Sequence, residues 1–113
     1  MTFIDARNQC ESDGAYLIRP RSQAENDWIF TIADFPYIWI GLDDIDEEGT
    51  FVTHDGSALT WTNWAENQPD SASSSEDAVH LHGGYMGQKW NDQNPGSRFQ
   101  VICSYDISRT YNL

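Results

Sequence analysis

The chain has 113 residues, of which 13% are aromatic, and this length and composition favour one folded domain over a disordered segment. Eighteen acidic residues against six basic ones give a formal net charge of −12, which argues against nucleic acid or an anionic membrane surface as a partner and favours cations. No apolar run is long enough to cross a bilayer, so we expect no membrane span.

The first elements along the chain are predicted to be a helix and a short strand. Thr2 and Asp5 form a capping-box-like start, and apolar residues then recur at helical spacing. Gly14 suits the end of this helix, because helices often end at a residue with positive φ. We therefore expect a helix over 2–15 and a short apolar strand over 15–20.

A second helix is predicted over residues 21–35. Ser22 with Glu25 is a capping box, and Pro36 ends the helical pattern. Apolar residues at helical spacing predict that one face of this helix is buried, comprising Ala24, Trp28, Ile32 and Phe35.

The remaining sequence predicts short strands around a long central loop. Asp55 and Gly56 indicate a turn between two strands, and later glycines indicate a hairpin. Two helices followed by short strands predict a single α+β domain over 1–113. The expected strands span 37–44, the two halves of 49–61, 77–82, 88–92 and 98–105, and the long loop spans 62–77.

The two cysteines, Cys10 and Cys103, lie near the two ends of the sequence. They form no CxxC motif, and two thiolates are too few for a four-thiolate zinc site. They form either a disulfide or two buried thiols, and positions that bracket the domain favour the disulfide. A disulfide would imply an oxidising, extracellular setting.

The loop and the segment after Trp90 carry side-chain oxygens of the kind that calcium binds. Calcium takes roughly 6–8 oxygens from carboxylates, amides and carbonyls in flexible geometry. The alternative is a solvated loop whose carboxylates face only water. The candidate calcium ligands are Gln68, Asp70, Glu76, Asn91 and Asp92.

A second acidic run, from Asp44 to Asp55, begins like an EF-hand loop. An EF-hand needs a helix on each side, whereas both flanks of this run are predicted to be strands. We therefore reject an EF-hand and keep Asp44 and Glu48 as candidate ligands of an auxiliary ion.

The three histidines could be either solvent-exposed polar residues or metal ligands. His80 and His82 alternate with Val79 and Leu81, so a strand would place both imidazoles on one face and the apolar pair on the other. Those imidazoles are either an exposed polar face, which is favoured, or half of a zinc site. His54 lies in a predicted turn and is expected to face solvent.

Motifs for catalysis are absent from the sequence: it contains no G-x-S-x-G, P-loop or H-E-x-x-H. The carboxylates could form an acid–base pair, but the neighbouring amides suit metal binding better. We therefore predict a binding protein and not an enzyme.

The motifs WIGL, NW, QPD, ED, WND and VICSY follow one another in a single order. Together they resemble the C-type lectin-like domain over about Phe3 to Tyr105. The resemblance implies a two-helix α+β fold with a long calcium-binding loop, in which the ion coordinates two sugar hydroxyls. It also implies that the five candidate ligands form the principal site, and that an auxiliary site involves Asp44, Glu48, Glu76 and Asp77.

Some positions depart from that family pattern. Ala78 and the region of Pro95 stand where members commonly carry a second disulfide, so order in the loop is expected to depend more on calcium. Ser71 follows the QPD triplet, where members that fill the auxiliary site often have an acidic residue. The family's first strand, before the first helix, has no counterpart, and the tail over 106–113 could cover the exposed sheet edge.

The resemblance implies calcium-dependent binding of galactose- or GalNAc-type glycans outside the cell. The QPD order places an amide donor at Gln68 before a carboxylate acceptor at Asp70, as in galactose-selective members. Tyr85 is the candidate ring to stack on the sugar. The predicted sugar-binding residues are Gln68, Asp70, Glu76, Asn91 and Tyr85. The alternative is a lectin-like module that binds protein, lipid or ice, with calcium in a structural role.

Overall fold

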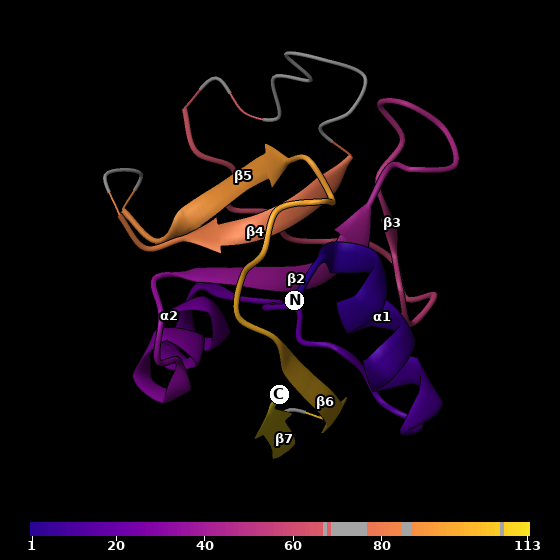
Figure 1. The fold of residues 1–113 in the computed structure, drawn as a ribbon. Helices are drawn as coiled ribbons and strands as arrows, with labels where there is room; N and C mark the ends of the chain where they lie inside the picture. Colours follow the sequence, from indigo (N-terminus) through magenta and orange to yellow (C-terminus); the bar gives the residue numbers. More distant parts are fainter. Residues whose placement is uncertain (67, 69–76, 85–86, 107) are drawn as a thin grey trace.

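The computed structural model describes residues 1–66, 68, 77–84, 87–106 and 108–113. Figure 1 shows the two helices beside the long strand β2, with β4 and β5 on one side of it and β6 and β7 on the other. The described residues form the predicted α+β fold, and none of their helices is long and apolar enough to cross a membrane. The elements are α1 (Phe3–Ser12), β1 (Tyr16–Leu17), α2 (Gln23–Ile32), β2 (Tyr37–Asp43), β3 (Val52–Thr53), β4 (Ala78–His82), β5 (Lys89–Gln93), β6 (Ile102–Asp106) and β7 (Arg109–Asn112).

Both helices begin at the predicted capping residues. The Thr2 hydroxyl accepts a hydrogen bond from the backbone N–H of Asp5 at 3.4 Å, and the Ser22 hydroxyl accepts one from the N–H of Glu25 at 3.1 Å. Each bond satisfies one of the N–H groups that a helix start leaves without an intrahelical partner. Gly14, with φ at +79°, follows the end of α1 as predicted.

The predicted buried face of α2 is largely wrong, because Ile32 alone among its four residues packs against a hydrophobic core cluster. Ala24 is exposed, Trp28 is 36% exposed, and Phe35 lies beyond the helix end and is 66% exposed. The fully buried residues of α2 are instead Asn26 and Ile29. A polar side chain can occupy the buried face because Asn26 hydrogen-bonds across to β5, a pairing that apolar periodicity does not reveal.

The strands form two sheets. The larger has the order β3-β2-β4-β5 and the smaller has the order β1-β6-β7, and all pairs are antiparallel. The hairpin of β4 and β5 matches the sequence prediction. The C-terminal tail supplies β7, which pairs with the edge of β6 that β1 leaves open.

Strand β2 is buried on both faces, and this explains its continuous apolar sequence. Ile38, Ile40 and Leu42 pack into one hydrophobic cluster, and Trp39 packs into the other. Gly41 lies where β1 crosses close by, since a Cβ there would approach the Leu17 carbonyl oxygen to 2.7 Å. This contact requires a glycine at position 41.

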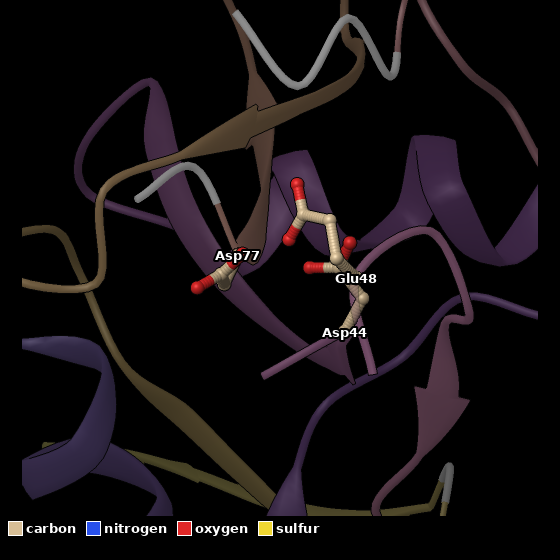
Figure 2. Close-up of side chains that lie close together, drawn as sticks. All are labelled: Asp44, Glu48 and Asp77. Atoms are coloured by element: carbon tan, nitrogen blue, oxygen red, sulfur yellow. The ribbon is translucent and has the colours of Figure 1, made fainter. Parts of the chain in front are cut away.

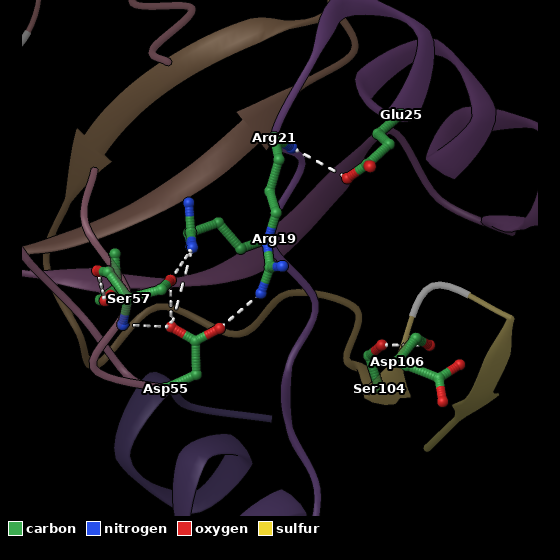
Figure 3. A network of polar contacts seen from close by, with 8 residues as sticks. Arg19, Arg21, Glu25, Asp55, Ser57, Ser104 and Asp106 are labelled. Carbon is green, nitrogen blue, oxygen red and sulfur yellow. Dashed lines mark hydrogen bonds and ion pairs between the residues drawn. The ribbon is translucent and has the colours of Figure 1, made fainter. Parts of the chain in front are cut away.

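The second strand predicted after the Asp55–Gly56 turn is wrong. Described residues 54–63 contain no strand. Side-chain hydrogen bonds and ion pairs, and not strand pairing, fix this segment (Figure 3). The Asp55 carboxylate accepts hydrogen bonds from the N–H and hydroxyl of Ser57 at 3.0 and 2.7 Å. The same carboxylate pairs with Arg21 at 2.5 Å, and Arg19 donates to the Ser57 hydroxyl at 2.6 Å.

The Asp55 network is a structural tie between the segment before α2 and the turn after β3. Burial of the Asp55 carboxyl opposes its ionisation, but the Ser57 hydrogen bonds and the two arginine charges outweigh burial and lower its pKa to about 2. The folded state therefore binds this proton more weakly than the unfolded chain. The stabilisation is present above pH 3.8 and is lost as the pH falls towards 2.

We expect Asp55→Asn to lower the free energy of unfolding by about 1–2 kcal/mol at pH 7, because asparagine keeps an acceptor but loses the ion pairs. Urea denaturation measures the change, with Asp46→Asn as the control because Asp46 is an exposed acid outside this network. The difference from wild type is expected to shrink between pH 4 and pH 2. A difference that stays constant over that interval would contradict the assignment.

The disulfide is confirmed. Cys10 of α1 is bonded to Cys103 of β6, with their Cα atoms 5.4 Å apart, and both residues are fully buried or nearly so. The bond joins the first helix to the smaller sheet across 93 residues of sequence.

Candidate metal and ligand site

Three carboxylates meet beside the end of β2 (Figure 2). Asp44 follows β2, Glu48 lies in the next loop, and Asp77 immediately precedes β4. Each offers an oxygen, and these oxygens all lie within 4.8 Å of one another. In the described part of the chain this is the one group of at least three histidine, cysteine or carboxylate side chains close enough to share an ion.

Backbone hydrogen bonds bring the two segments of the cluster together. The N–H of Asp44 donates to the carbonyl oxygen of Asp77 at 3.0 Å, next to the β2–β4 pairing. The N–H of Gly49 donates to Oδ2 of Asp44 at 2.8 Å, which folds the loop that carries Glu48 back over the cluster. The carboxylates therefore converge through sheet pairing and a short loop.

The prediction that His54 faces solvent is wrong. Its side chain is 5% exposed, and its Nε2 lies 2.8 Å from Oδ2 of Asp43. Oδ1 of Asp43 accepts a hydrogen bond from the N–H of Ile45 at 3.1 Å, so this pair fixes the turn that leads into the cluster. Burial of the Asp43 carboxyl opposes its ionisation, but the His54 and Ile45 hydrogen bonds outweigh burial and lower its pKa.

The acidic cluster contains buried oxygens that no hydrogen bond satisfies. Oδ1 of Asp44 and Oδ1 of Asp77 are both inaccessible to solvent and have no hydrogen-bond partner. Burial raises the pKa of both carboxyls, Asp77 raises that of Asp44 further, and Glu48 raises that of Asp77 further. Buried acceptors are normally paired, and a bound cation is one way to satisfy these two. The all-oxygen donor set fits a hard cation such as calcium.

Of the predicted principal ligands, the structure describes Gln68, Asn91 and Asp92. Asn91 and Asp92 lie within β5, where Asp92 is fully buried and Asn91 is half-buried. Trp64 forms a parallel bridge with Trp90, which places the segment leading to Gln68 alongside the start of β5. The other predicted ligands and the predicted stacking ring, namely Asp70, Glu76 and Tyr85, lie outside the described residues.

Comparison with known proteins identifies the family. The family model of the lectin C-type domain matches residues 1–105. This chain belongs to the C-type lectin family. The alpha-N-acetylgalactosamine-specific lectin of Patiria pectinifera is 43% identical over an alignment of 113 positions, which covers 90% of this chain and 67% of that lectin. Bovine pulmonary surfactant-associated protein D is 34% identical over an alignment of 106 positions, which covers 92% of this chain.

The C-type lectin fold is also evident from solved structures. The C-type lectin CEL-I of Cucumaria echinata superposes with a TM-score of 0.82 at 29% identity, covering 91% of this chain and 81% of that one. A calcium-independent type II antifreeze protein shares the fold with a TM-score of 0.83, covering 91% of this chain and 77% of that one, at only 22% identity. This C-type lectin domain spans 28% of the length of bovine surfactant protein D.

In this C-type lectin domain, the two histidines of β4 share one face of the strand, and both are buried. The predicted alternation is confirmed, because Val79 and Leu81 pack into the same hydrophobic cluster as Ile38 of β2, while His80 and His82 share the other face. The favoured prediction of an exposed polar face is wrong, since His80 is 2% and His82 is 7% exposed. The face is buried because aromatic rings cover it.

Those covering rings come from β2 and from the segment before β6. The His80 ring lies 4.5 Å from the Phe99 ring and 6.0 Å from that of Trp39, and the His82 ring lies 4.8 Å from that of Tyr37. Burial lowers the pKa of His80 to about 4, so this imidazole is neutral at physiological pH. The acidic cluster contains no histidine, and the described residues give the predicted half-zinc site no third ligand.

One residue that supports β5 was not anticipated from the sequence. The Asn26 side chain donates to the carbonyl oxygen of Gln88 at 2.9 Å and accepts from the indole N–H of Trp90 at 3.0 Å. It therefore fixes the strand immediately before Asn91. Asn26 lies between Glu25 and Asp27 in the sequence, so no local pattern marks it as buried or indicates its partners.

The acidic run from Asp44 to Asp55 is not flanked by helices: strand β2 precedes it, strand β3 lies within it, and described residues 56–66 after it form no helix. β2 ends at Asp43, and β3 begins at Val52. This agrees with the rejection of an EF-hand, whose loop lies between two helices.

Proposed function

We propose that this C-type lectin domain binds carbohydrate in a calcium-dependent manner and prefers galactose- or N-acetylgalactosamine-type glycans. The observation that carries the proposal is the convergence of Asp44, Glu48 and Asp77, with two buried oxygens left without partners. Such a cluster is costly without a cation, because burial and like charges both oppose ionisation. The relative from Patiria pectinifera is named as an N-acetylgalactosamine-specific lectin, which supports the choice of sugar.

Two groups of residues would hold calcium in this proposal. Asp44, Glu48 and Asp77, together with Glu76, would form the auxiliary site. The principal site would consist of Gln68, Asp70, Glu76, Asn91 and Asp92. Bound calcium would supply a positive centre that coordinates two vicinal sugar hydroxyls.

The residues of the principal site would also select the sugar. An amide can offer its oxygen to the ion and its N–H to a hydroxyl, whereas a carboxylate offers one oxygen to each. Gln68 would therefore donate to one hydroxyl and Asp70 would accept from the next. Tyr85 is the candidate ring for the apolar face of the sugar.

Chromatography on immobilised galactose tests the function directly. We expect retention in calcium, elution by free galactose, and elution by a chelator. Asp92→Asn removes one charge at nearly constant shape and is expected to abolish retention, while Asp46→Asn, an exposed acid outside the proposed ligands, keeps it. Elution by chelator but not by galactose would instead favour the alternative of a protein-, lipid- or ice-binding module with structural calcium, a module whose fold the antifreeze protein shares.

Asp44→Asn is expected to distinguish two effects of the acidic cluster: the destabilisation that it causes without calcium, and the stabilisation that it provides when calcium is bound. Because burial raises the pKa of Asp44 and Asp77, the calcium-free fold gains stability as the pH falls from neutral towards their titration range. In chelator at pH 7, Asp44→Asn should therefore unfold at the same or a higher temperature than wild type. Calcium at about 100 times its dissociation constant should stabilise wild type by about 2.7 kcal/mol and the variant by less.

The matched control for that experiment is Asp46→Asn, in the same loop but outside the cluster. Its response to calcium should equal that of wild type. Differential scanning calorimetry in chelator and in calcium gives all the required values. A wild-type unfolding temperature that calcium leaves unchanged would count against both metal sites.

We also propose an extracellular location, because the Cys10–Cys103 disulfide requires an oxidising compartment.

A further inference from the structure

His80 of β4 contacts one of the proposed calcium ligands directly. It lies opposite Asn91 in the antiparallel pairing of β4 with β5. Its Nε2 is 3.2 Å from the side-chain amide nitrogen of Asn91. The imidazole is 2% exposed and is enclosed by the rings of Phe99, Trp39 and Tyr37, with centroids 4.5, 6.0 and 5.9 Å away.

The hydrogen bonds of His80 define its tautomer. Its Nδ1 lies 3.0 Å from the backbone carbonyl oxygen of Leu81, which can only accept, so Nδ1 carries the proton. In the neutral ring, Nε2 is then an acceptor. Asn91 must present its NH₂ group to Nε2, and not its oxygen.

This bond fixes the orientation of the Asn91 amide. With the nitrogen directed at His80, the carbonyl oxygen Oδ1 faces away from the imidazole, and the second N–H remains available. An isolated asparagine could rotate its amide by 180° at little cost, because the two orientations have nearly the same shape. A single acceptor at Nε2 removes that freedom.

We infer that His80 is a positioning residue for the ligand site, through its hydrogen bond to Asn91. It holds Oδ1 of Asn91 towards the calcium ion and leaves one amide N–H for a sugar hydroxyl. The inference rests on the proposed function, since it takes Asn91 as a calcium ligand. Partners that orient metal ligands typically contribute 10–100-fold to metal affinity, so about that effect is expected here.

The hydrogen bond can be tested without calcium. Nitrogen-15 NMR of the histidine ring is expected to show His80 as the Nδ1–H tautomer in chelator, with one proton of the Asn91 side-chain amide protected from exchange. An Nε2–H tautomer would overturn the inference, because that nitrogen could not then accept from Asn91.

The link to the metal is tested by substitution at position 80. His80→Phe keeps a ring among the aromatic neighbours but removes the acceptor. His80→Gln places an amide oxygen near the position of Nε2 and can restore the bond. By isothermal titration calorimetry we expect the calcium dissociation constant to rise about 10-fold or more in His80→Phe and to return towards the wild-type value in His80→Gln.

Phe99→Leu is the matched control for packing. It disturbs the ring that contacts His80 most closely but leaves both hydrogen bonds of the imidazole in place. It should lower the unfolding temperature and leave the calcium dissociation constant near that of wild type. In an Asn91→Ala background, His80→Phe should have no further effect on calcium affinity.

The outcomes separate this inference from the proposed function. Equal calcium affinity of wild type and folded His80→Phe would overturn the positioning role and leave the function standing. Absence of calcium binding by wild type would overturn the function, and the metal-directed role with it. Were His80→Phe not to fold, His80→Gln and the tautomer measurement would decide, and weak calcium binding by a folded His80→Gln would then count against the inference.

Discussion

Replacing both Cys10 and Cys103 by alanine is expected to lower the free energy of unfolding by about 4–5 kcal/mol. The bond closes a loop with a sequence separation of 93 residues, and its loss releases the chain entropy that the crosslink removes from the unfolded state. Alanine is the appropriate substitution because both positions are buried, where a serine hydroxyl would need a partner. For a domain of this size we expect the unfolding temperature to fall by about 15–20 °C.

Denaturation of reduced wild-type protein separates the crosslink from the packing of its sulfur atoms. Relative to oxidised wild type, reduced wild type and the double alanine variant should lose nearly the same free energy of unfolding. The alanine variant should lose slightly more. Calcium affinity in folded samples of either protein should stay close to the oxidised value, since the bond joins α1 to β6 and not to the segments of the acidic cluster. Oxidised and reduced wild type with equal stability would show that the bond contributes little.

The combined substitution Gln68→Glu with Asp70→Asn is expected to change sugar selectivity from galactose-type towards mannose-type ligands. In the proposed site, the pair would keep two calcium-binding oxygens and the net charge, but would exchange the hydrogen-bond donor and the acceptor that face the sugar. A hydroxyl that meets the wrong partner leaves a polar group unsatisfied, at a cost of roughly 1–3 kcal/mol. That cost corresponds to about a tenfold to hundredfold change in affinity.

A glycan array with wild type and the double variant measures this change. The calcium-induced rise in unfolding temperature is the control, and it should be the same in both proteins because the ion keeps its ligands. Tyr85→Ala should weaken galactose binding in wild type if this ring stacks on the sugar. An identical glycan profile before and after the exchange would rule out recognition through residues 68 and 70, and would favour a protein, lipid or ice ligand.

The family, the fold class and the disulfide could all be predicted from the sequence. The motif order from WIGL to WND indicated a C-type lectin-like domain, and the family match over residues 1–105 confirms it. Helix starts at Thr2 and Ser22 were predictable because capping is a contact between residues three apart. The principal ligand set stays a prediction, since Asp70 and Glu76 lie outside the described residues.

Burial was the property that local patterns predicted poorly. Period-two alternation placed His80 and His82 on one strand face correctly, but the Phe99 segment that covers that face lies in a different part of the chain. His54 was expected in solvent because it sits in a turn, and it is buried by its pairing with Asp43. Asn26 was not anticipated for the same reason, because its partners are more than sixty residues away.

The sequence by itself therefore determined which residue types are present and which short-range contacts they make: the helix caps, the β4–β5 hairpin, and a supply of acids too large for the six basic residues to neutralise. Local sequence patterns did not indicate which acids meet: the family resemblance named Asp44, Glu48 and Asp77 together, and the tertiary structure shows their carboxylates side by side. Asp44 and Asp77 are 33 positions apart in the sequence, and the β2–β4 pairing brings them together. Each of them then has a buried carboxylate oxygen that no hydrogen bond satisfies. The physical reason is that burial and proximity depend on long-range chain packing, whereas a sequence pattern reports only neighbours within a few residues.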